Sequence, residues 1–167
     1  MLLDHVIPKP PSLKGYELHR LVQGLTDGQS PLFADMGDSL IVRTDKPITD
    51  TGTAPRAFKD GDVIGFELRA CVSKKLKGKH VYFPTADWRS RHDWLRRQGT
   101  RHGFEPLTVN CHASQAKVDK GTGRSFTVDQ TDFVGILRVM DSARFDNAIA
   151  NGIGSTARAF GFGMLVI

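Results

Sequence analysis

Apolar residues in the first half of the chain follow strand spacing and helix spacing in turn. LLDHVIP (2–8) is short, apolar-rich and ends at prolines, which predicts a strand. GYELHRLVQGL carries apolar residues at the i, i+3, i+4 and i+7 positions of one helix face, namely Leu18, Leu21, Val22 and Leu25. SLIVRT (39–44) and DVIGFELRACV (62–72) predict strands around a Thr-, Pro- and Gly-rich loop.

The second half predicts a regular alternation of strands and helices. KHVYFP (79–84) favours a strand and TADWRSRHDWLRRQ (85–98) a helix with Thr85 as N-cap. FEPLTVNCHA and SFTVDQTDFVGILRVM favour strands on either side of QAKVDKGTGR, whose Gly-Thr-Gly suits a hairpin tip. MDSARFDNAIANG favours a short helix, capped by Asp141 or Ser142 and ending near Gly152, before a last strand in FGFGMLVI.

The order of the second half, strand-helix-strand-strand-helix-strand, is that of a ferredoxin-like unit. The first half has the same start, but only about seventeen residues separate its last two predicted strands. That is too short for a full helix with two loops. The sequence therefore predicts an α+β fold of two ferredoxin-like units in tandem, at residues 1–76 and 77–167, with the first unit shortened.

Composition narrows the class of protein. The 167 residues are 40% hydrophobic, enough for a packed core. No apolar stretch reaches the ~18 residues of a membrane span, and MLLDHVIPKPP has acid and proline where a signal peptide has an apolar block. We therefore expect a cytoplasmic protein without a membrane partner. Cys71 and Cys111 belong to no Cys-x-x-Cys pair, so they indicate small core residues rather than a zinc site or disulfide framework.

The net charge of +5 is concentrated in one region. Residues 56–101 contain twelve Lys plus Arg and five Asp plus Glu, whereas the rest of the chain contains eleven and thirteen. Such a surplus favours a polyanionic partner, because each cation that neutralises a phosphate releases condensed counterions. The alternative is a basic face that serves solubility alone.

Tyr16 and His19 are the candidates for proton transfer. Both fall away from the apolar stripe of the first predicted helix, one turn apart, and Arg20 is adjacent. An imidazole with a pKa near ~6.5 exchanges protons near neutrality, and a phenol can orient a hydroxyl. Neither residue needs a metal for this chemistry, although a single histidine is also a common structural residue.

The glycine-rich segment GIGSTARAFGFG (152–163) is a second candidate site. Gly152, Gly154 and Ala157 match the dinucleotide pattern GxGxxA, but that pattern follows a strand and opens a helix, and here the order is reversed. A nucleotide-dependent enzyme is therefore disfavoured. The remaining interpretations are a loop whose amides and Arg158 hold phosphate, or a turn that is merely rich in glycine.

These segments together resemble the CRISPR-associated endoribonucleases of the CasE kind, which are components of Cascade complexes and members of the RAMP superfamily. GYELHRL is similar to the family's Tyr-x-x-His segment on the first helix. GFELRACVSK resembles Phe-x-Leu-Arg-Ala-Asn-Pro-x-Lys, with Cys71 and Val72 in place of Asn and Pro. DWLRRQG resembles a Trp-Leu segment, and GIGSTARAFGFG resembles the terminal loop, with Arg158 where lysine is usual and one extra residue.

The resemblance implies metal-independent cleavage of CRISPR precursor RNA at the base of each repeat stem-loop, without a cofactor. The ribose 2′-hydroxyl would attack the adjacent phosphate and leave a 2′,3′-cyclic phosphate. His19 would act as acid or base, and Tyr16 would orient the hydroxyl. The RNA-binding residues would be Arg20, the hairpin cations Lys117, Lys120 and Arg124, and Gly152, Gly154 and Arg158 of the terminal loop.

The resemblance also implies membership of a multi-protein CRISPR interference complex. Some members of the superfamily bind RNA without cutting it. A catalytically inactive RNA-binding component of such a complex is therefore the alternative function.

Overall fold

The first sheet of the computed structural model, which describes residues 1–119 and 123–167, is small and antiparallel. It contains β1 (Leu3–Pro8), β2 (Leu32–Asp35) and β3 (Ser39–Thr44) in the order β1-β3-β2. Helix α1 (Gly15–Leu25) packs on it through Leu18 and Val22, the buried residues of its predicted apolar face. At four residues, β2 is too short to have shown a period in the sequence.

The first unit is shortened, as predicted. Its order β1-β3-β2 is that of a ferredoxin-like sheet without the fourth strand, which would pair with β1. At that edge an isolated bridge joins Asp4 and Thr53, and their amides and carbonyls exchange hydrogen bonds of 2.8 and 2.9 Å. A loop thus takes the place of a strand.

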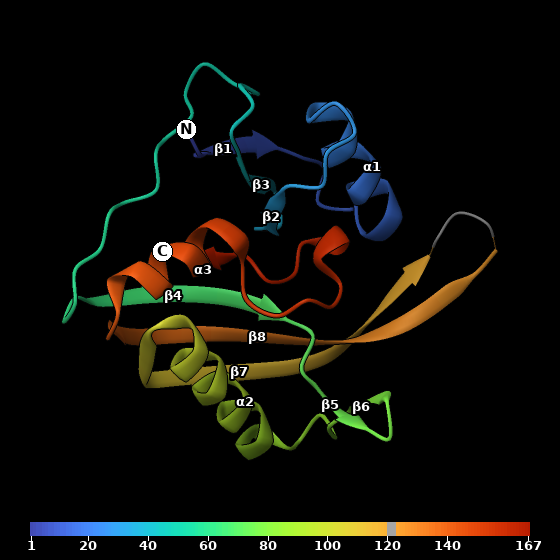
Figure 1. The fold of residues 1–167 in the computed structure, drawn as a ribbon. Coiled ribbons are helices and arrows are strands. Elements are labelled where there is room, and N and C mark those ends of the chain that lie inside the picture. The colour runs from blue at the N-terminus through green and yellow to red at the C-terminus, as the bar shows by residue number, and fades with distance from the viewer. Residues whose placement is uncertain (120–122) are drawn as a thin grey trace.

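The second sheet is a complete ferredoxin-like unit (Figure 1). Its order is β7-β8-β4-β9, from β4 (Val63–Ala70), β7 (Phe104–Asp119), β8 (Ser125–Val139) and β9 (Leu165–Val166). Helices α2 (Trp88–His102) and α3 (Ser142–Asn151) bury one face of the sheet. The centre of this core includes Leu68 of β4, Leu95 of α2, Phe133 of β8 and Phe145 of α3.

Two strands that the sequence predicted belong to other sheets than expected. The strand predicted at 62–72 is β4, but it pairs with β8 and β9 and so belongs to the second sheet rather than to the first unit. The strand predicted at 79–84 is β6 (Lys79–Tyr82), whose one partner among the described strands is β5 (Ser73–Leu76). The reason is burial, since β4 alternates buried and exposed residues whereas β5 and β6 bury none. We therefore propose a boundary between Thr44 and Val63 instead of residues 76 and 77.

Three predicted boundaries also differ from the structure. Helix α2 begins at Trp88, because Asp87 rather than Thr85 accepts a hydrogen bond from the Ser90 amide, at 3.0 Å. The arms of the β7–β8 hairpin extend to the pair Asp119 and Ser125, so the first half of the stretch expected to be a polar connection, residues 115–119, is strand. The last strand is limited to β9, because a 3₁₀ turn (Arg158–Phe160) and two positive-φ glycines precede it.

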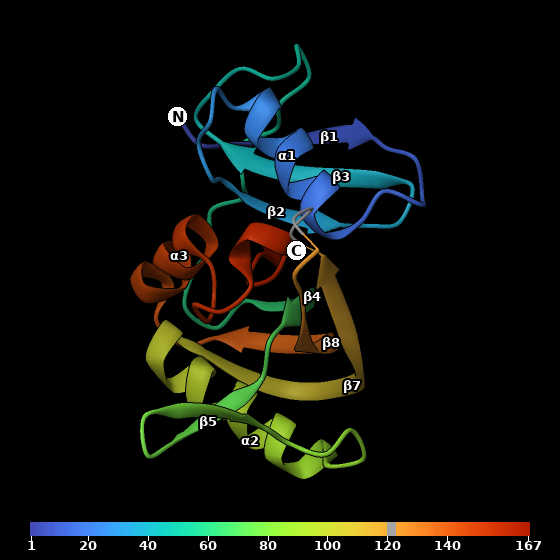
Figure 2. The same cartoon turned by 90° about the vertical axis from the view of Figure 1, so that its right-hand side faces the viewer.

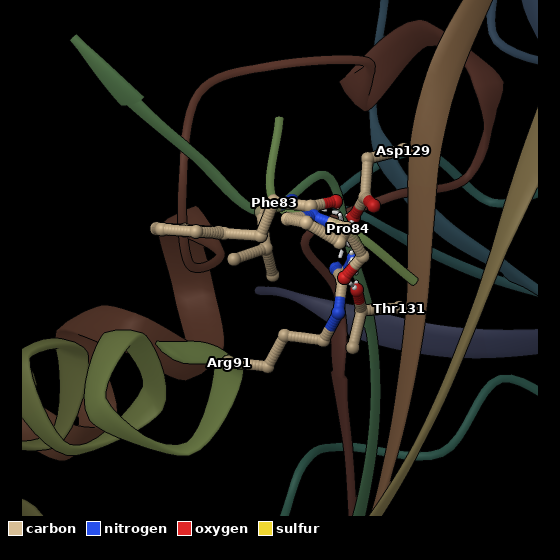
Figure 3. A network of polar contacts seen from close by, with 6 residues as sticks. Phe83, Pro84, Arg91, Asp129 and Thr131 are labelled. Atoms are coloured by element: carbon tan, nitrogen blue, oxygen red, sulfur yellow. Dashed lines mark hydrogen bonds and ion pairs between the residues drawn. The ribbon is translucent and has the colours of Figure 1, made fainter. Parts of the chain in front are cut away.

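Arg91 of α2 is fully buried although it belongs to the basic segment of the sequence (Figure 3). Its Nη1 donates to Asp129 Oδ2 at 2.8 Å and to Thr131 Oγ1 at 2.5 Å, both on β8. Its Nη2 donates to the carbonyls of Phe83 and Pro84 at 3.1 and 3.2 Å. Arg91 therefore fixes the exit of the β5–β6 hairpin to the second sheet.

Arg43 joins the two sheets. Its Nε and Nη2 donate to the carboxylate of Asp4 on the neighbouring strand at 2.6 and 2.7 Å. Its Nη1 donates to the carbonyls of Ile149 in α3 and Leu165 in β9 at 2.9 and 3.2 Å. The side chain is only 3% exposed. This one residue ties the half that carries α1 to the half that carries the terminal loop.

Candidate nucleic-acid interface

Tyr16 and His19 lie on the side of α1 that faces the terminal loop. Leu18 and Val22, on an adjoining face of the helix, are buried in the first core, whereas Tyr16 and His19 are half-buried. Their ring centroids are 6.1 Å apart. The ring of Phe160, from the 3₁₀ turn, lies 6.1 Å from the ring of His19. The fold therefore brings the first helix and the glycine-rich segment together.

A cleft of about 380 Å³ opens beside this pair, between α1, the far end of the β7–β8 hairpin and the terminal loop. Figure 2 shows the far ends of β7 and β8 rising toward α1 and the first sheet. Gly15, Leu18 and Phe160 line the cleft on one side and Lys117 lines it on the other. The predicted cation Lys117 is thus close to the predicted catalytic helix.

The glycines of the terminal segment serve the chain's own packing. Gly152 has φ +76°, and a Cβ there would come within 2.8 Å of the Gly163 carbonyl oxygen. Gly163 has φ +89°, and a Cβ there would come equally close, at 2.8 Å, to the Ile153 carbonyl oxygen. The Ile153 amide donates to the Gly163 carbonyl across this contact at 2.8 Å. The groups that approach these two glycines are another part of the same loop and, at Gly152, the Leu32 side chain, and RNA binding by Gly152 and Gly154 stays a prediction.

Arg158 turns inward at the loop. Its Nε donates to the Gly154 carbonyl at 2.7 Å, Nη2 donates to the same oxygen, and Nη1 donates to the Asn151 carbonyl at the end of α3. Burial lowers the pKa of the Arg158 guanidinium below its usual range. In this arrangement the side chain stabilises the end of α3 and the glycine turn. Whether it also binds RNA stays a prediction.

Three of the remaining predicted cations are exposed. Arg20 lies on α1, Lys117 on β7, and Arg124 directly before the first residue of β8. Lys120 lies outside the described residues. The hairpin therefore presents at least two cations to solvent, as the sequence predicted. Gly154 is half-buried and faces the Trp94 ring, with 3.6 Å between an added Cβ and the ring.

A basic groove of about 600 Å³ was not anticipated from the sequence. It lies between the β5–β6 hairpin, α2 and the glycine turn, and its cationic or titratable lining residues are Lys75, His80, Arg97, Arg101, His102 and Arg158. Burial, with a smaller effect of the neighbouring Arg101 charge, lowers the pKa of His102 below its usual 6.5. The charge surplus indicated this region, but it could not indicate that the hairpin and helix face each other.

Part of the surplus charge is neutralised by ion pairs within the protein, one of them buried and one half-buried. Arg91 is paired with Asp129, and Arg69 is paired with Asp132 at 2.7 Å.

Within the described part of the chain, no group of three His, Cys, Asp or Glu side chains is placed to hold a metal ion. Among the same residues, no helix combines the length and apolarity needed to cross a bilayer.

Comparison with known families places the chain. A family model described as CRISPR associated protein matches residues 18–167. The protein therefore belongs to this CRISPR-associated family, and the resemblance stated from the sequence is confirmed at that level. A search of curated proteins gave no match.

Solved structures share the fold over nearly the whole chain. Thermus thermophilus Cse3, bound to an RNA representing a pre-cleavage complex, is 24% identical with a TM-score of 0.76, covering 99% of this chain and 97% of that one. The CRISPR-associated protein Cas6e from Escherichia coli K-12 is 21% identical with a TM-score of 0.76, covering 99% and 98%. A chain of a CRISPR RNA-guided surveillance complex is 18% identical with a TM-score of 0.76, covering 98% and 97%. At these identities the likeness establishes the tandem ferredoxin-like fold.

Proposed function

We propose that this protein is a metal-independent endoribonuclease that cuts CRISPR precursor RNA at the base of each repeat stem-loop. Family membership supports the CRISPR assignment, and a structure of the same fold is described as Cse3 with a pre-cleavage RNA. The observation that carries the proposal is the cluster of Tyr16, His19 and Phe160 beside an open cleft. It offers two proton-transfer groups, one turn apart, at a site that RNA can reach.

The reaction is a transfer of the phosphate between two oxygens of the RNA. The 2′-oxygen attacks the adjacent phosphorus and loses its proton, and the bond to the 5′-oxygen breaks as that oxygen gains a proton. The products are a 2′,3′-cyclic phosphate and a 5′-hydroxyl. His19 supplies or removes one of these protons, Tyr16 orients the 2′-hydroxyl, and the charge of Arg20 offsets the negative charge of the transition state.

RNA binding depends on the cationic surfaces around this pair. Lys117 and Arg124 on the β7–β8 hairpin contact the backbone of the stem, because the deep major groove of A-form RNA hides its bases. The basic groove along α2 provides a second phosphate-binding surface. As a CRISPR-associated protein, the chain acts in the cytoplasm as a subunit of a multi-protein RNA-guided complex, the kind of assembly from which one structure of this fold comes.

Cleavage of labelled repeat RNA in EDTA tests the proposal. Wild type is expected to cut, and His19→Ala is expected to bind the RNA within about tenfold of wild-type affinity but to lose about 10²–10⁴-fold in rate. His112→Ala, an exposed histidine on β7, is the matched control and should cut normally. A 2′-deoxyribose 5′ of the scissile phosphate should also stop the reaction. Normal cutting by His19→Ala would exclude the catalytic assignment.

One observation favours the alternative function, an RNA-binding subunit without catalysis. Arg158 occupies the position where lysine is usual in the resembled loop, and its guanidinium is already bonded to the Gly154 and Asn151 carbonyls. A cation in this state is less available to a phosphate. Under this alternative, wild type binds the repeat and cuts it neither with nor without divalent ions.

A further inference from the structure

The cleft beside His19 has the size of a pocket for one nucleotide. Its volume of about 380 Å³ falls within the ~300–1,000 Å³ range of small-ligand sites. Phe160 contributes to its wall and lies 6.1 Å from the His19 ring. Gly15 and Leu18, which precede Tyr16 and His19 in the chain, form the wall on α1. Tyr16 and His19 are not among the lining residues, so Phe160 is the side chain that connects a group in this cleft to the candidate catalytic pair.

The strand register determines which hairpin side chains face the cleft. Val118 and Ala116 pack with Phe160, so that face of β7 points toward the terminal loop. Side chains alternate along a strand, and Ser114 is therefore on the same face. Gln130 is directly opposite Ser114 on β8 and shares this face as well. A hydroxyl and a carboxamide thus lie side by side on this face, next to the apolar side chains of Ala116 and Val118.

We propose that this cleft binds the first unpaired nucleobase on the 3′ side of the scissile phosphate and reads its edge. The inference rests on the proposed function, in which the cut falls at the base of a stem. A base inside the stem is paired and cannot enter, whereas an unpaired base can be splayed out into a pocket. Phe160 provides an aromatic surface for it, and Gln130 and Ser114 each offer a donor and an acceptor.

The charges around the cleft fit an RNA backbone at its rim and a neutral base inside. Lys14 and Lys117 line the cleft and are exposed, so both can contact phosphates. Arg69 and Asp35 also line it, and their charges are compensated by ion pairs with Asp132 at 2.7 Å and with Lys9 at 3.2 Å. The Gln130 amide has one long contact, donating to Asp132 Oδ2 at 3.4 Å. Its carboxamide is therefore the polar group best placed to select a base.

Occupancy of the pocket can be measured without cleavage. The His19→Ala protein is bound to repeat RNA that carries 2-aminopurine either at the first unpaired position 3′ of the cut or three nucleotides farther on. Acrylamide quenching of the bound RNA then reports solvent access to each base. The first position should be protected about threefold or more relative to the distal one, because an enclosed base is shielded by the pocket walls. Equal access at the two positions would overturn the proposal.

Base selection is measured from single-turnover cleavage at saturating enzyme. RNAs carry adenine, cytosine, guanine or uracil at the same position, or no base. For wild type, the fastest and the slowest of the four cleavage rates should differ about tenfold or more, as expected for hydrogen bonds to a base edge. This ratio is called the spread below. Gln130→Leu should reduce the spread to about threefold or less while cutting the abasic RNA as wild type does. Gln29→Leu, the same change at an exposed glutamine after α1, should keep the full spread.

The outcomes separate the pocket from the reaction. If Gln130→Leu unfolds normally and keeps the full spread of rates, Gln130 does not select the base. If the four RNAs are cut at equal rates by wild type, the cleft does not select a base at all. If wild type cuts none of the RNAs, the proposed function fails, and the acrylamide measurement still decides whether the base occupies the cleft.

Discussion

Arg91 and Arg43 are both buried, but they connect different parts of the molecule. Arg91 bonds Asp129, Thr131 and two carbonyls that all lie in the second half of the chain. Arg43 bonds Asp4 in its own sheet and two carbonyls in the other half. The first arginine therefore closes one folding unit, and the second holds two units in register. The shortened first unit needs this connection, because a loop replaces its fourth strand.

The comparison predicts that loss of Arg91 has the largest effect on stability. Arg91→Met leaves the carboxylate of Asp129, which is 2% exposed, buried without its cation. The expected cost is about 3–5 kcal/mol in the free energy of unfolding, measured by urea denaturation. Arg91→Met combined with Asp129→Leu should recover more than half of the loss, since no unpaired charge remains. Arg96→Met, at an exposed arginine of the same helix, is the control and should cost under about 0.5 kcal/mol.

Loss of Arg43 should cost less stability and more function. The Asp4 side chain is 24% exposed, so water partly replaces its partner, and Arg43→Met is expected to cost about 2–3 kcal/mol. The hydrogen bonds of Arg43 also position α1 against the terminal loop. The single-turnover cleavage rate should therefore fall about tenfold or more, while RNA affinity changes less. Arg43→Lys should not restore the rate, since an ammonium lacks the planar fork that spans Asp4 and two carbonyls. A variant that loses stability but cuts at the wild-type rate would show that Arg43 does not position the catalytic helix.

The local patterns in the sequence predicted most elements because their causes are local. Helix α1 follows from an apolar stripe, the β7–β8 hairpin from two apolar runs around a glycine turn, and α3 from an Asp141 cap and a glycine end. The sheet that β4 joins was assigned wrongly. Its alternating pattern specifies a half-buried strand and does not specify the partner, which depends on contacts with β8, sixty or more residues away.

The site shows the same division between local and non-local causes. That Tyr16 and His19 lie on one side of a helix followed from helical geometry, whereas the approach of Phe160 depends on how two units dock. The number of Lys and Arg residues in the sequence revealed the basic segment. That number could not distinguish the buried Arg91 from the exposed lysines of β5 and β6. In the terminal loop, the glycines indicated a close approach without indicating that the approaching groups include the loop itself and the side chains of Leu32 and Phe33.

Arg158 is intermediate between the buried arginines and the exposed cations. An exposed side chain on a loop seldom contributes more than about 0.5 kcal/mol to folding. Its hydrogen bonds to the Gly154 and Asn151 carbonyls raise that expectation for Arg158→Ala to about 1–2 kcal/mol in thermal or urea unfolding. We also expect weaker binding of repeat RNA in a filter-binding titration performed where the variant is folded. Unchanged affinity in the folded variant would assign Arg158 to the loop alone.

Loss of the exposed hairpin cations should have the smallest effect on stability, and its effect should be confined to RNA binding. Lys117 and Arg124 are both exposed, and neither has an ion pair with another described residue, so Lys117→Gln with Arg124→Gln should change the unfolding free energy by under about 0.5 kcal/mol. Repeat-RNA affinity should still fall, and the slope of log K against log salt should become shallower by about 1 to 2, because each phosphate contact contributes about 0.7–0.9 to the slope. Lys46→Gln and Lys59→Gln, made together in the first unit and the linking segment, remove the same charge from outside the hairpin and should leave the slope nearly unchanged. An equal change in slope for the two double variants would mean that net charge, rather than the hairpin, governs RNA binding. The groove between the β5–β6 hairpin and α2 would then be the surface to test for RNA contact.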